Sequence, residues 1–381
     1  MKKYKICIVG DGLSGLITAL TLSKLNIEID LVSKKQKQEI KDNRTTAISP
    51  TNFKFISKFL SKSQYNFFYK CKKVSLYHEN DRNRLINFMN FENSNKNLMY
   101  IFENKKLKKI LLSYIKKSKQ IKIIREDVKK ISADETSVQI KNKKRFYEMI
   151  LLCTGRVSKI NENIFGKRSI KNDKNEVAFT SIINHDLGKI NPKQYFMKEG
   201  PLAILPINDK KFSLIWSMSD KYSKLQKNEF KDLILRKLKN IFTDKARLRL
   251  SDIKSFPIYF QFNKSFYKKN ISAIGESAYN VYPVAGQGFN LVLRDIESLY
   301  KKIKENISLG LQIKDSIILK DLFAARKPEN FILGLGINLT QSFFRYNKFT
   351  EPLKNSFLKD LDRYTFFKKI GLKFTDKGIF N

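Results

Sequence analysis

The chain has 381 residues, of which 42% are hydrophobic, and this suits one large α/β unit or two closely packed domains. Its three cysteines and two histidines are too few and too scattered for a disulfide framework or a metal site, so we expect a reduced, cytoplasmic setting. No stretch reaches the roughly 20 apolar residues of a bilayer span, and the first apolar run is too short for a signal peptide.

The net charge of +39 raises the question of an anionic partner. Lysine occurs along the whole chain, without one basic block and without the interleaved aromatic residues typical of RNA-binding segments. We therefore expect no nucleic-acid partner, and we attribute most of the charge to a general compositional bias. Attraction to an anionic membrane surface remains an open alternative.

The first predicted elements are a buried strand over residues 4–9, a glycine-rich turn, a helix over 16–25 and a strand over 27–32. This order is typical of the opening of a dinucleotide-binding fold. In the turn, Gly10 allows the tight bend, Gly12 lets a pyrophosphate approach the backbone, and Gly15 lets helix and strand pack closely. Free N–H groups at the helix start favour an anion. The alternative is a glycine-rich turn without a ligand.

The end of the second strand departs from the usual dinucleotide-binding pattern. Ser33 stands where an acidic residue normally bonds a ribose hydroxyl, and Asp30 lies earlier, inside the strand. A serine hydroxyl can still bond a ribose, although more weakly than a carboxylate. Ser33 therefore stays a candidate cofactor contact.

The remaining elements alternate between strand-rich and helical segments. We predict a helix over 50–72, short strands over 74–102, a basic helix over 107–118, a strand over 121–131, a hairpin over 136–152 that ends in a buried strand, strands over 176–220, an amphipathic helix over 224–242, a strand over 271–274, helices over 288–304 and 315–326, and a helical, turn-rich tail over 329–381. No long linker separates these segments, so we expect two interleaved domains.

A second glycine motif spans Gly275 to Asp295. It reads Gly275-Glu276-Ser277-Ala278-Tyr279, then Pro283-Val284-Ala285-Gly286-Gln287-Gly288-Phe289-Asn290-Leu291, and ends with Arg294-Asp295. Two close glycines on a proline-initiated loop that opens a helix predict another anion-seeking helix start.

This segment resembles the "G-D-A-A-H … P-x-x-G-Q-G-x-N-x-G-x-x-D" signature of group A flavoprotein monooxygenases. It is most similar to the signature of the ubiquinone-biosynthesis hydroxylase family. Four further segments follow the family's pattern in the same order: 42–48 resembles "D-x-R-x-x-A-L", 100–104 resembles "Y-V-V-E-N", 200–206 resembles "G-P-L-A-L-L-P" with Trp216 placed as in "S-L-V-W", and 255–257 resembles "S-F-P-L". The resemblance thus covers nearly the whole chain.

The resemblance implies an α/β fold in which an FAD-binding, Rossmann-like domain of the p-hydroxybenzoate hydroxylase type is interleaved with a smaller β-rich substrate domain. Residues 1–75, 98–170 and 265–330 would form the FAD-binding domain, and residues 76–97 and 171–264 the substrate domain. Residues 331–381 would form a helical C-terminal segment.

The resemblance also implies the site residues, and no side chain is expected to act as a catalytic nucleophile. The FAD contacts would be Gly10, Gly12, Leu13, Ser14, Gly15, Ser33, Arg44, Asn104, Val128, Gly275, Glu276, Pro283, Gly286, Gln287, Gly288, Phe289 and Asn290. Backbone N–H groups near Gly288, Phe289 and Asn290 would face the flavin pyrimidine edge, where the helix dipole favours the negative charge of the reduced form. The substrate pocket would include Pro206, Trp216 and Tyr279.

Four positions depart from the family's pattern. Ser33, Thr154 and Glu276 replace carboxylates or change their length, and Tyr279 replaces a histidine. In the family, the residue at the position of Thr154 helps to bind both FAD and NAD(P)H. These changes keep one alternative open, a degenerate flavin-binding scaffold in a biosynthetic complex.

The implied activity is hydroxylation of the aromatic ring of a polyprenyl phenol in ubiquinone biosynthesis, with FAD as cofactor and NAD(P)H and O₂ as co-substrates. The expected partners are a lipophilic phenol or quinone precursor, an anionic membrane surface and other ubiquinone-biosynthesis proteins. The expected location is cytoplasmic, with a peripheral position at the inner membrane face as an option. The second alternative is a lipid-directed flavin reductase or dehydrogenase.

Overall fold

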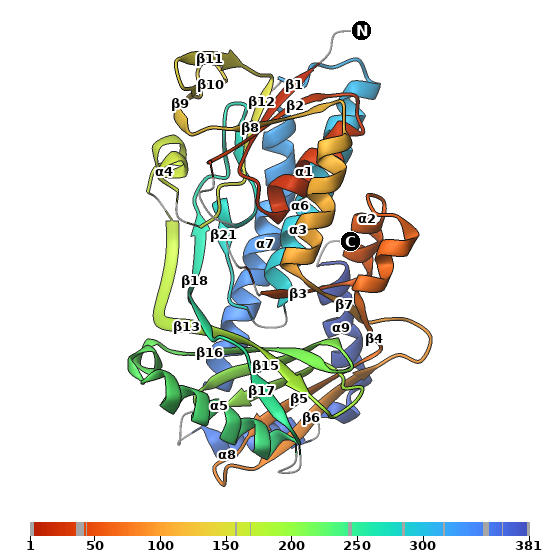
Figure 1. Cartoon of the computed structure of the whole chain (residues 1–381), viewed down its shortest axis with the longest axis vertical. Helices are drawn as coiled ribbons and strands as arrows, with labels where there is room; N and C mark the ends of the chain where they lie inside the picture. Colours follow the sequence, from red (N-terminus) through yellow and green to blue (C-terminus); the bar gives the residue numbers. More distant parts are fainter. Residues whose placement is uncertain are drawn as a thin grey trace.

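Two large β-sheets organise the fold, and long helices run between them in the computed structural model (Figure 1). The structure describes residues 4–35, 42, 44–156, 158–167, 169–242, 246–283, 286–314, 317–345, 350–359 and 361–378. Asn43 of the segment 42–48 and Val284 and Ala285 of the second glycine motif lie outside this range.

The first sheet has six strands in the order β19-β20-β12-β1-β2-β8. Its strands are β1 (Lys5–Val9), β2 (Glu28–Ser33), β8 (Ile121–Arg125), β12 (Met149–Leu152), β19 (Tyr267–Lys268) and β20 (Ile271–Ala273). All neighbours run parallel except β19 and β20, which are antiparallel. The central strands are short apolar runs because both of their faces are covered.

Three helices cover one face of this sheet: α1 (Leu13–Ser23), α3 (Asn104–Lys117) and α6 (Gln287–Ser308). The other face packs against a three-stranded sheet made of β9 (Val128–Ser132), β10 (Ser137–Ile140) and β11 (Lys143–Phe146). The strand predicted over 121–131 is therefore two strands, β8 and β9, in different sheets. The predicted hairpin before β12 is confirmed as β10 and β11.

The second large sheet has nine strands, and β17 pairs with β13 at its side. The order of the other eight is β21-β18-β13-β16-β15-β14-β5-β6. The bounds of the nine strands are β5 (Lys73–Glu79), β6 (Leu85–Glu92), β13 (Ser169–His185), β14 (Lys193–Met197), β15 (Gly200–Asn208), β16 (Lys211–Ser219), β17 (Leu248–Leu250), β18 (Lys254–Asn263) and β21 (Tyr279–Asn280). Helix α5 (Lys227–Ile241) covers one face with Phe230, Ile234 and Leu238. The opposite face is turned toward the first sheet and its helices.

A small sheet of β3 (Thr45–Ile48), β7 (Met99–Glu103) and β4 (Tyr69–Cys71) lies between the two large ones, beside α2 (Pro50–Ser57). The helix predicted over 50–72 is shorter than expected, because a 3-10 turn over 62–67 and β4 follow α2. A further helix, α4 (Lys159–Phe165), follows β12.

The C-terminal segment is helical, as predicted, and consists of α7 (Ile317–Phe344), α8 (Glu351–Lys359) and α9 (Thr365–Asp376). The sequence predicted an end near residue 326, but α7 continues through Pro328. Within the described ranges, no helix is long and apolar enough to cross a membrane.

Candidate active site

One large cavity, with a volume of about 950 Å³, connects the two halves of the fold. One end is bordered by the turn after β1, and the other by the inner face of the nine-stranded sheet. Residues of the second glycine motif line the part between them. The cavity can therefore hold an elongated cofactor and a second molecule at its sheet end.

The glycine turn after β1 lines one end of the cavity with Gly12, Leu13 and Ser14. Helix α1 begins at Leu13, so the first N–H groups of the helix lack intrahelical partners and can meet an anion. A Cβ added at Gly12 would meet nothing within 4 Å, which leaves the backbone open to a ligand. The turn is therefore an accessible binding site for a phosphate group.

Gly10 and Gly15 do not line the cavity, because they are packing positions. A Cβ at Gly15 would lie 2.0 Å from the carbonyl oxygen of Gly10, and one at Gly10 would lie 2.2 Å from that of Cys153. Gly10 also has φ +114°, a backbone conformation that side chains disfavour. Gly10 and Gly15 are therefore needed for the packing of the turn, whereas Gly12 exposes its backbone to the cavity.

A basic cluster, which sequence reasoning did not find, borders the same end. Arg125 lies at the end of β8, and its Nη1 donates to Asp11 Oδ2 at 2.6 Å and to Ser33 Oγ. Lys108 of α3 lies 3.9 Å from the same Asp11 oxygen, and both cations line the cavity. Ser33 itself does not line the cavity, because Arg125 covers its hydroxyl. The basic helix and the arginine at the strand end were the available signals, but only the fold brings Lys108 and Arg125 together at Asp11.

The second glycine motif lies directly beside the first. Gly275 has φ +72°, and a Cβ there would lie 3.0 Å from Ser14 Oγ, so Gly275 packs behind the turn and does not line the cavity. Gly286, with φ 63°, precedes α6, and Pro283, Gly286, Gln287, Gly288, Phe289 and Asn290 line the cavity. Two helix N-termini thus open into one space.

The side chain of Asn290 holds this region together. Its Oδ1 accepts from the backbone N–H of Ser49 at 2.9 Å and from Asn52 Nδ2 at 2.8 Å, and its Nδ2 donates to the Gly286 carbonyl at 3.0 Å. The side-chain amide of Asn290 is thus engaged within the protein, where it ties Ser49 and α2 to the start of α6. The flavin contact expected near Asn290 stays a prediction.

Arg44 and Asn104 also line the cavity. Arg44 Nε and Nη2 both donate to Asp42 at 2.9 Å, and its guanidinium lies 5.4 Å from the centre of the Phe256 ring. The hydrogen bond to Asp42 raises the pKa of Arg44 above its usual value. Asn104 Oδ1 accepts from Thr46 Oγ1 at 2.6 Å. Both side chains are held in place before a ligand arrives.

Two of the altered positions differ in their access to the cavity. Glu276 lines it with a half-exposed carboxylate, 3.4 Å from Arg156 Nε. Thr154 lies behind the wall, where its Oγ1 donates to Asn161 Oδ1 at 3.1 Å and lies 3.2 Å from Ser277 Oγ. Glu276 can reach a ligand hydroxyl, whereas Thr154 serves the local packing.

The sheet end of the cavity is mostly apolar. Paired positions on adjacent strands form a row across the sheet that faces the cavity: Leu76, Gln194, Ala203, Ile215 and Thr180. Val74, Phe91, Leu205 and Ile258 extend this wall. The lining suits a hydrophobic molecule with a polar group near Gln194 and Thr180.

Besides Gly10, Gly15, Ser33 and Gly275, three further predicted residues do not line this cavity. Successive side chains on a strand point to opposite faces, and Trp216 pairs with Leu202 on the face that α5 covers. Trp216 is fully buried there, and its Nε1 donates to the Gly200 carbonyl at 3.1 Å. Pro206 pairs with Phe212 of the same core. Val128 begins β9 and packs at the edge of the core below the first sheet. These placements correct the sequence-based ones.

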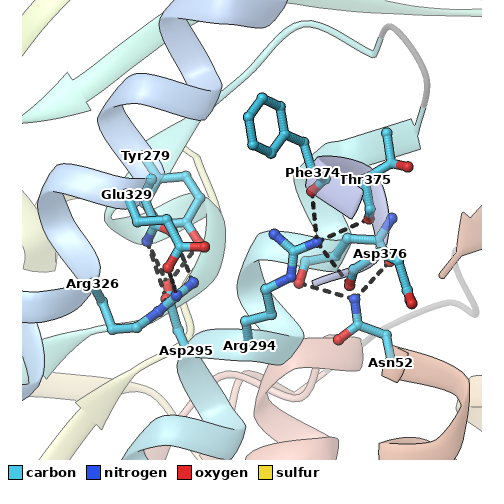
Figure 2. A network of polar contacts seen from close by, with 11 residues as sticks. Asn52, Tyr279, Arg294, Asp295, Arg326, Glu329, Phe374, Thr375 and Asp376 are labelled. Atoms are coloured by element: carbon cyan, nitrogen blue, oxygen red, sulfur yellow. Dashed lines mark hydrogen bonds and ion pairs between the residues drawn. The ribbon is translucent and has the colours of Figure 1, made fainter. Parts of the chain in front are cut away.

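Tyr279 lines the cavity and connects it to a buried charge network between α6 and α7 (Figure 2). Its hydroxyl donates to Asp295 Oδ2 at 2.6 Å. The Asp295 carboxylate also accepts from Arg326 Nε at 2.8 Å and from Asn330 Nδ2 at 3.0 Å, and Arg326 pairs with Glu329. Burial, together with the Asp295 charge, raises the pKa of Tyr279 well above its usual value. Tyr279 is therefore a neutral donor that is fixed by α6.

The neighbouring Arg294 holds the C-terminal helix against the cavity (Figure 2). Its Nη2 donates to the carbonyls of Thr375 and Asp376 at 2.9 and 3.1 Å, at the C-terminal end of α9. A cation at this end also meets the negative end of the helix dipole. Gly371, Leu372 and Thr375 of α9 line the cavity. Consecutive residues of α6, Arg294 and Asp295, thus fasten α9 and α7.

These features fit FAD: an open glycine cradle at one helix start, a second helix start in the same cavity, and space for a further molecule beyond it. Together with the matches that follow, they place the chain in the class of FAD-dependent monooxygenases. The chain belongs to the FAD binding domain family, which its residues 3–309 match. The predicted family resemblance and the predicted cofactor are thereby confirmed.

Named relatives agree with this class. The chain is 22% identical to the ubiquinone biosynthesis monooxygenase COQ6 of Dictyostelium discoideum, over 92% of this chain and 87% of that protein. It is 27% identical to the 3-demethoxyubiquinol 3-hydroxylase of Escherichia coli, over 40% of each chain.

Solved structures show the same fold. Pseudomonas putida p-nitrophenol 4-monooxygenase PnpA superposes with a TM-score of 0.80 at 13% identity, over 100% of both chains. Klebsiella pneumoniae HpxO, solved with FAD and uric acid, has a TM-score of 0.75 at 11% identity, over 98% of this chain and 96% of that one. The predicted fold class is confirmed.

Proposed function

We propose that the chain hydroxylates the aromatic ring of a polyprenyl phenol, a precursor of ubiquinone, with NAD(P)H and O₂ as co-substrates. The apolar wall around Ala203 and Ile215, continuous with the flavin motif, is the observation that carries this proposal. The names of the relatives support it, since they act in ubiquinone biosynthesis. A cytoplasmic location at a membrane surface and contact with other proteins of that pathway belong to the same proposal.

FAD supplies the redox chemistry and the activation of O₂. The N–H groups after Gly12 would bind its diphosphate, with Arg125 and Lys108 nearby as cations. The N–H groups that follow Gly286 would face the pyrimidine edge, and Glu276 would accept a hydrogen bond from the ribityl chain. At the sheet end, Gln194 and Thr180 would orient the ring hydroxyl, while the apolar wall excludes water from the reacting carbon.

The first test is a spectrum and a product analysis. Gently purified protein should be yellow, and it should consume NAD(P)H and O₂ when a polyprenyl phenol is added, with a hydroxylated product. NAD(P)H consumption with reduced lipid and no hydroxylation would instead identify a flavin reductase. Bound flavin without any turnover would identify a scaffold and contradict the proposal.

Ala203→Phe should separate the substrate end from the cofactor end. The phenylalanine ring would fill the space between Gln194 and Ile215. We therefore expect at least a tenfold loss of hydroxylation with unchanged flavin content. Ala203→Ser, which keeps the volume nearly constant, is the matched control. Equal activity of the phenylalanine variant and the wild type would place the substrate elsewhere.

Arg125→Ala should weaken flavin binding about tenfold, which corresponds to about 1.4 kcal/mol, because the variant loses a cation that borders the glycine turn. Flavin fluorescence during equilibrium dialysis measures the dissociation constant. Lys122→Ala, on the exposed side of the same strand β8, is the charge-matched control. An equal effect of both variants would mean that net charge, and not this contact, assists binding.

A further inference from the structure

The C-terminal part of α7 and helix α8 lie at the end of the molecule opposite β1 (Figure 1). Both expose large apolar side chains there. Leu339 and Phe343 of α7 are 67% and 41% exposed, and Leu353 and Phe357 of α8 are 75% and 56% exposed. Each pair is four residues apart, so each lies on one side of its helix. The rings of Phe343 and Phe357 contact each other edge to face, with centroids 6.0 Å apart. These four residues, the C-terminal apolar face, are therefore contiguous.

Helix α8 buries two charged residues beside the core residue Leu358 and exposes two large apolar ones. Its buried side carries Glu351 and Lys354, which pair at 2.7 Å. The Glu351 carboxylate also lies 3.0 Å from His78 Nε2. Burying these charges while exposing Leu353 and Phe357 is unfavourable in water. The contact of Glu351 with His78 of β5 and the burial of Leu358 fix which side of α8 points outward, so exposure of the apolar side is built into the fold.

The C-terminal apolar face also borders the cavity. Thr340, next to Leu339 and itself exposed, lines the cavity, and so do Gly371 and Leu372 of α9. Phe344 stacks on Phe196 of the cavity wall with ring centroids 3.7 Å apart. An apolar molecule arriving at this face would therefore meet the cavity between α7 and α9.

Cations accompany the apolar side chains. Arg345 directly follows α7, and Lys359 ends α8; both are exposed. The chain as a whole carries a net charge of +39. Basic residues around an exposed apolar face are complementary to anionic lipid head groups above an acyl layer.

We propose that the C-terminal apolar face docks on an anionic phospholipid bilayer and brings the opening between α7 and α9 to its surface. Leu339, Phe343, Leu353 and Phe357 would enter the acyl boundary, with Arg345 and Lys359 at the head groups. The proposed function already includes a position at a membrane surface, and the new inference assigns that contact to this face. The second part, entry of a lipophilic substrate through this opening, also rests on the proposed function.

Sedimentation of the full-length holoprotein with vesicles tests the docking. We expect binding to vesicles of phosphatidylcholine with phosphatidylglycerol and much weaker binding to phosphatidylcholine alone. The double substitution Leu353→Ser and Phe357→Ser should weaken binding to the anionic vesicles at least tenfold. Phe146→Ser is the matched control, because Phe146 is 61% exposed on β11, far from this face.

Three results would overturn the docking proposal. The first is wild-type protein that binds neither vesicle, and the second is an equal loss of binding in the double variant and in Phe146→Ser. The third is a wild-type dimer in solution that the double variant abolishes, without vesicle binding, since the face would then join two copies of the chain.

A turnover measurement separates this proposal from the proposed function. In the double variant, hydroxylation of a short-chain phenol in solution should be unchanged, while hydroxylation of a bilayer-embedded phenol should fall with vesicle binding. Vesicle binding without any hydroxylation would contradict the proposed function and leave the docking intact. Equal turnover of the embedded phenol by both proteins would contradict entry through this face.

Discussion

Replacing Asp295 by alanine should lower the free energy of unfolding by about 3–5 kcal/mol. The carboxylate is 1% exposed and accepts hydrogen bonds from Tyr279, Arg326 and Asn330. Its removal leaves the buried Arg326 guanidinium with Glu329 as its remaining charged partner and frees the Tyr279 hydroxyl. Chemical denaturation of the flavin-free protein, followed by circular dichroism, measures the change.

Two further variants test whether the loss of stability comes from the contacts of the Asp295 carboxylate. Tyr279→Phe removes one hydrogen bond to a charged group and should cost about 1.5–3 kcal/mol, less than the loss of the carboxylate. Adding Arg326→Leu to Asp295→Ala should cost less than the sum of the two single losses, because the Asp295–Arg326 contact is already absent in the first variant. Stability losses that simply add would show that the two residues do not act as a pair.

Gly15→Ala should destabilise the fold and abolish flavin retention, whereas Gly12→Ala should leave the fold intact and only weaken flavin binding. At Gly15 the added carbon would lie 2.0 Å from the Gly10 carbonyl oxygen and 3.3 Å from Cys153 Cβ, which forces α1 away from the sheet. Overpacking of this kind costs about 1–3 kcal/mol, and more where the backbone itself must move. Thermal unfolding of both flavin-free variants compares their folds.

The same carbon at Gly12 points into open space, where the diphosphate would approach. We therefore expect an unchanged melting temperature and at least a tenfold rise in the flavin dissociation constant for Gly12→Ala, measured by fluorescence titration. If the two variants unfolded at the same temperature, the distinction between Gly15 as a packing position and Gly12 as a ligand-facing position would be wrong.

Local patterns were sufficient for the parts of the site that lie within one segment. The turn Gly10 to Gly15 is contained in a single strand–turn–helix unit, and Gly286 to Asn290 in a single loop and helix start. The helix N-termini follow from backbone geometry alone, so their neighbours in sequence are also their neighbours in space. Gly12 to Ser14 of the first segment and Gly286 to Asn290 of the second line the cavity, whereas Gly10 and Gly15 pack behind the turn.

Placement across the nine-stranded sheet could not be predicted in the same way. The alternation along β15 and β16 separates Trp216 from Ile215, but it does not say which face meets the cavity. That choice depends on α5, which covers the Trp216 side. The substrate wall therefore contains Ala203 and Ile215 in place of Pro206 and Trp216.

Long-range contacts also decided the remaining differences. Arg125 meets Ser33 across 92 positions of the chain, and Asn330 meets Asp295 across 35. Bonds from Arg326 and Asn330 hold α7 on both sides of Pro328, where the sequence alone favoured a helix end.

The sequence by itself determined the two glycine motifs, the α/β class and the cofactor, since each depends on contacts within a short segment. Only the tertiary structure decided which strand faces line the cavity, how the basic cluster meets the turn, and that α8 turns its apolar side outward. These depend on burial and charge pairing between residues far apart in the chain, which no local pattern contains.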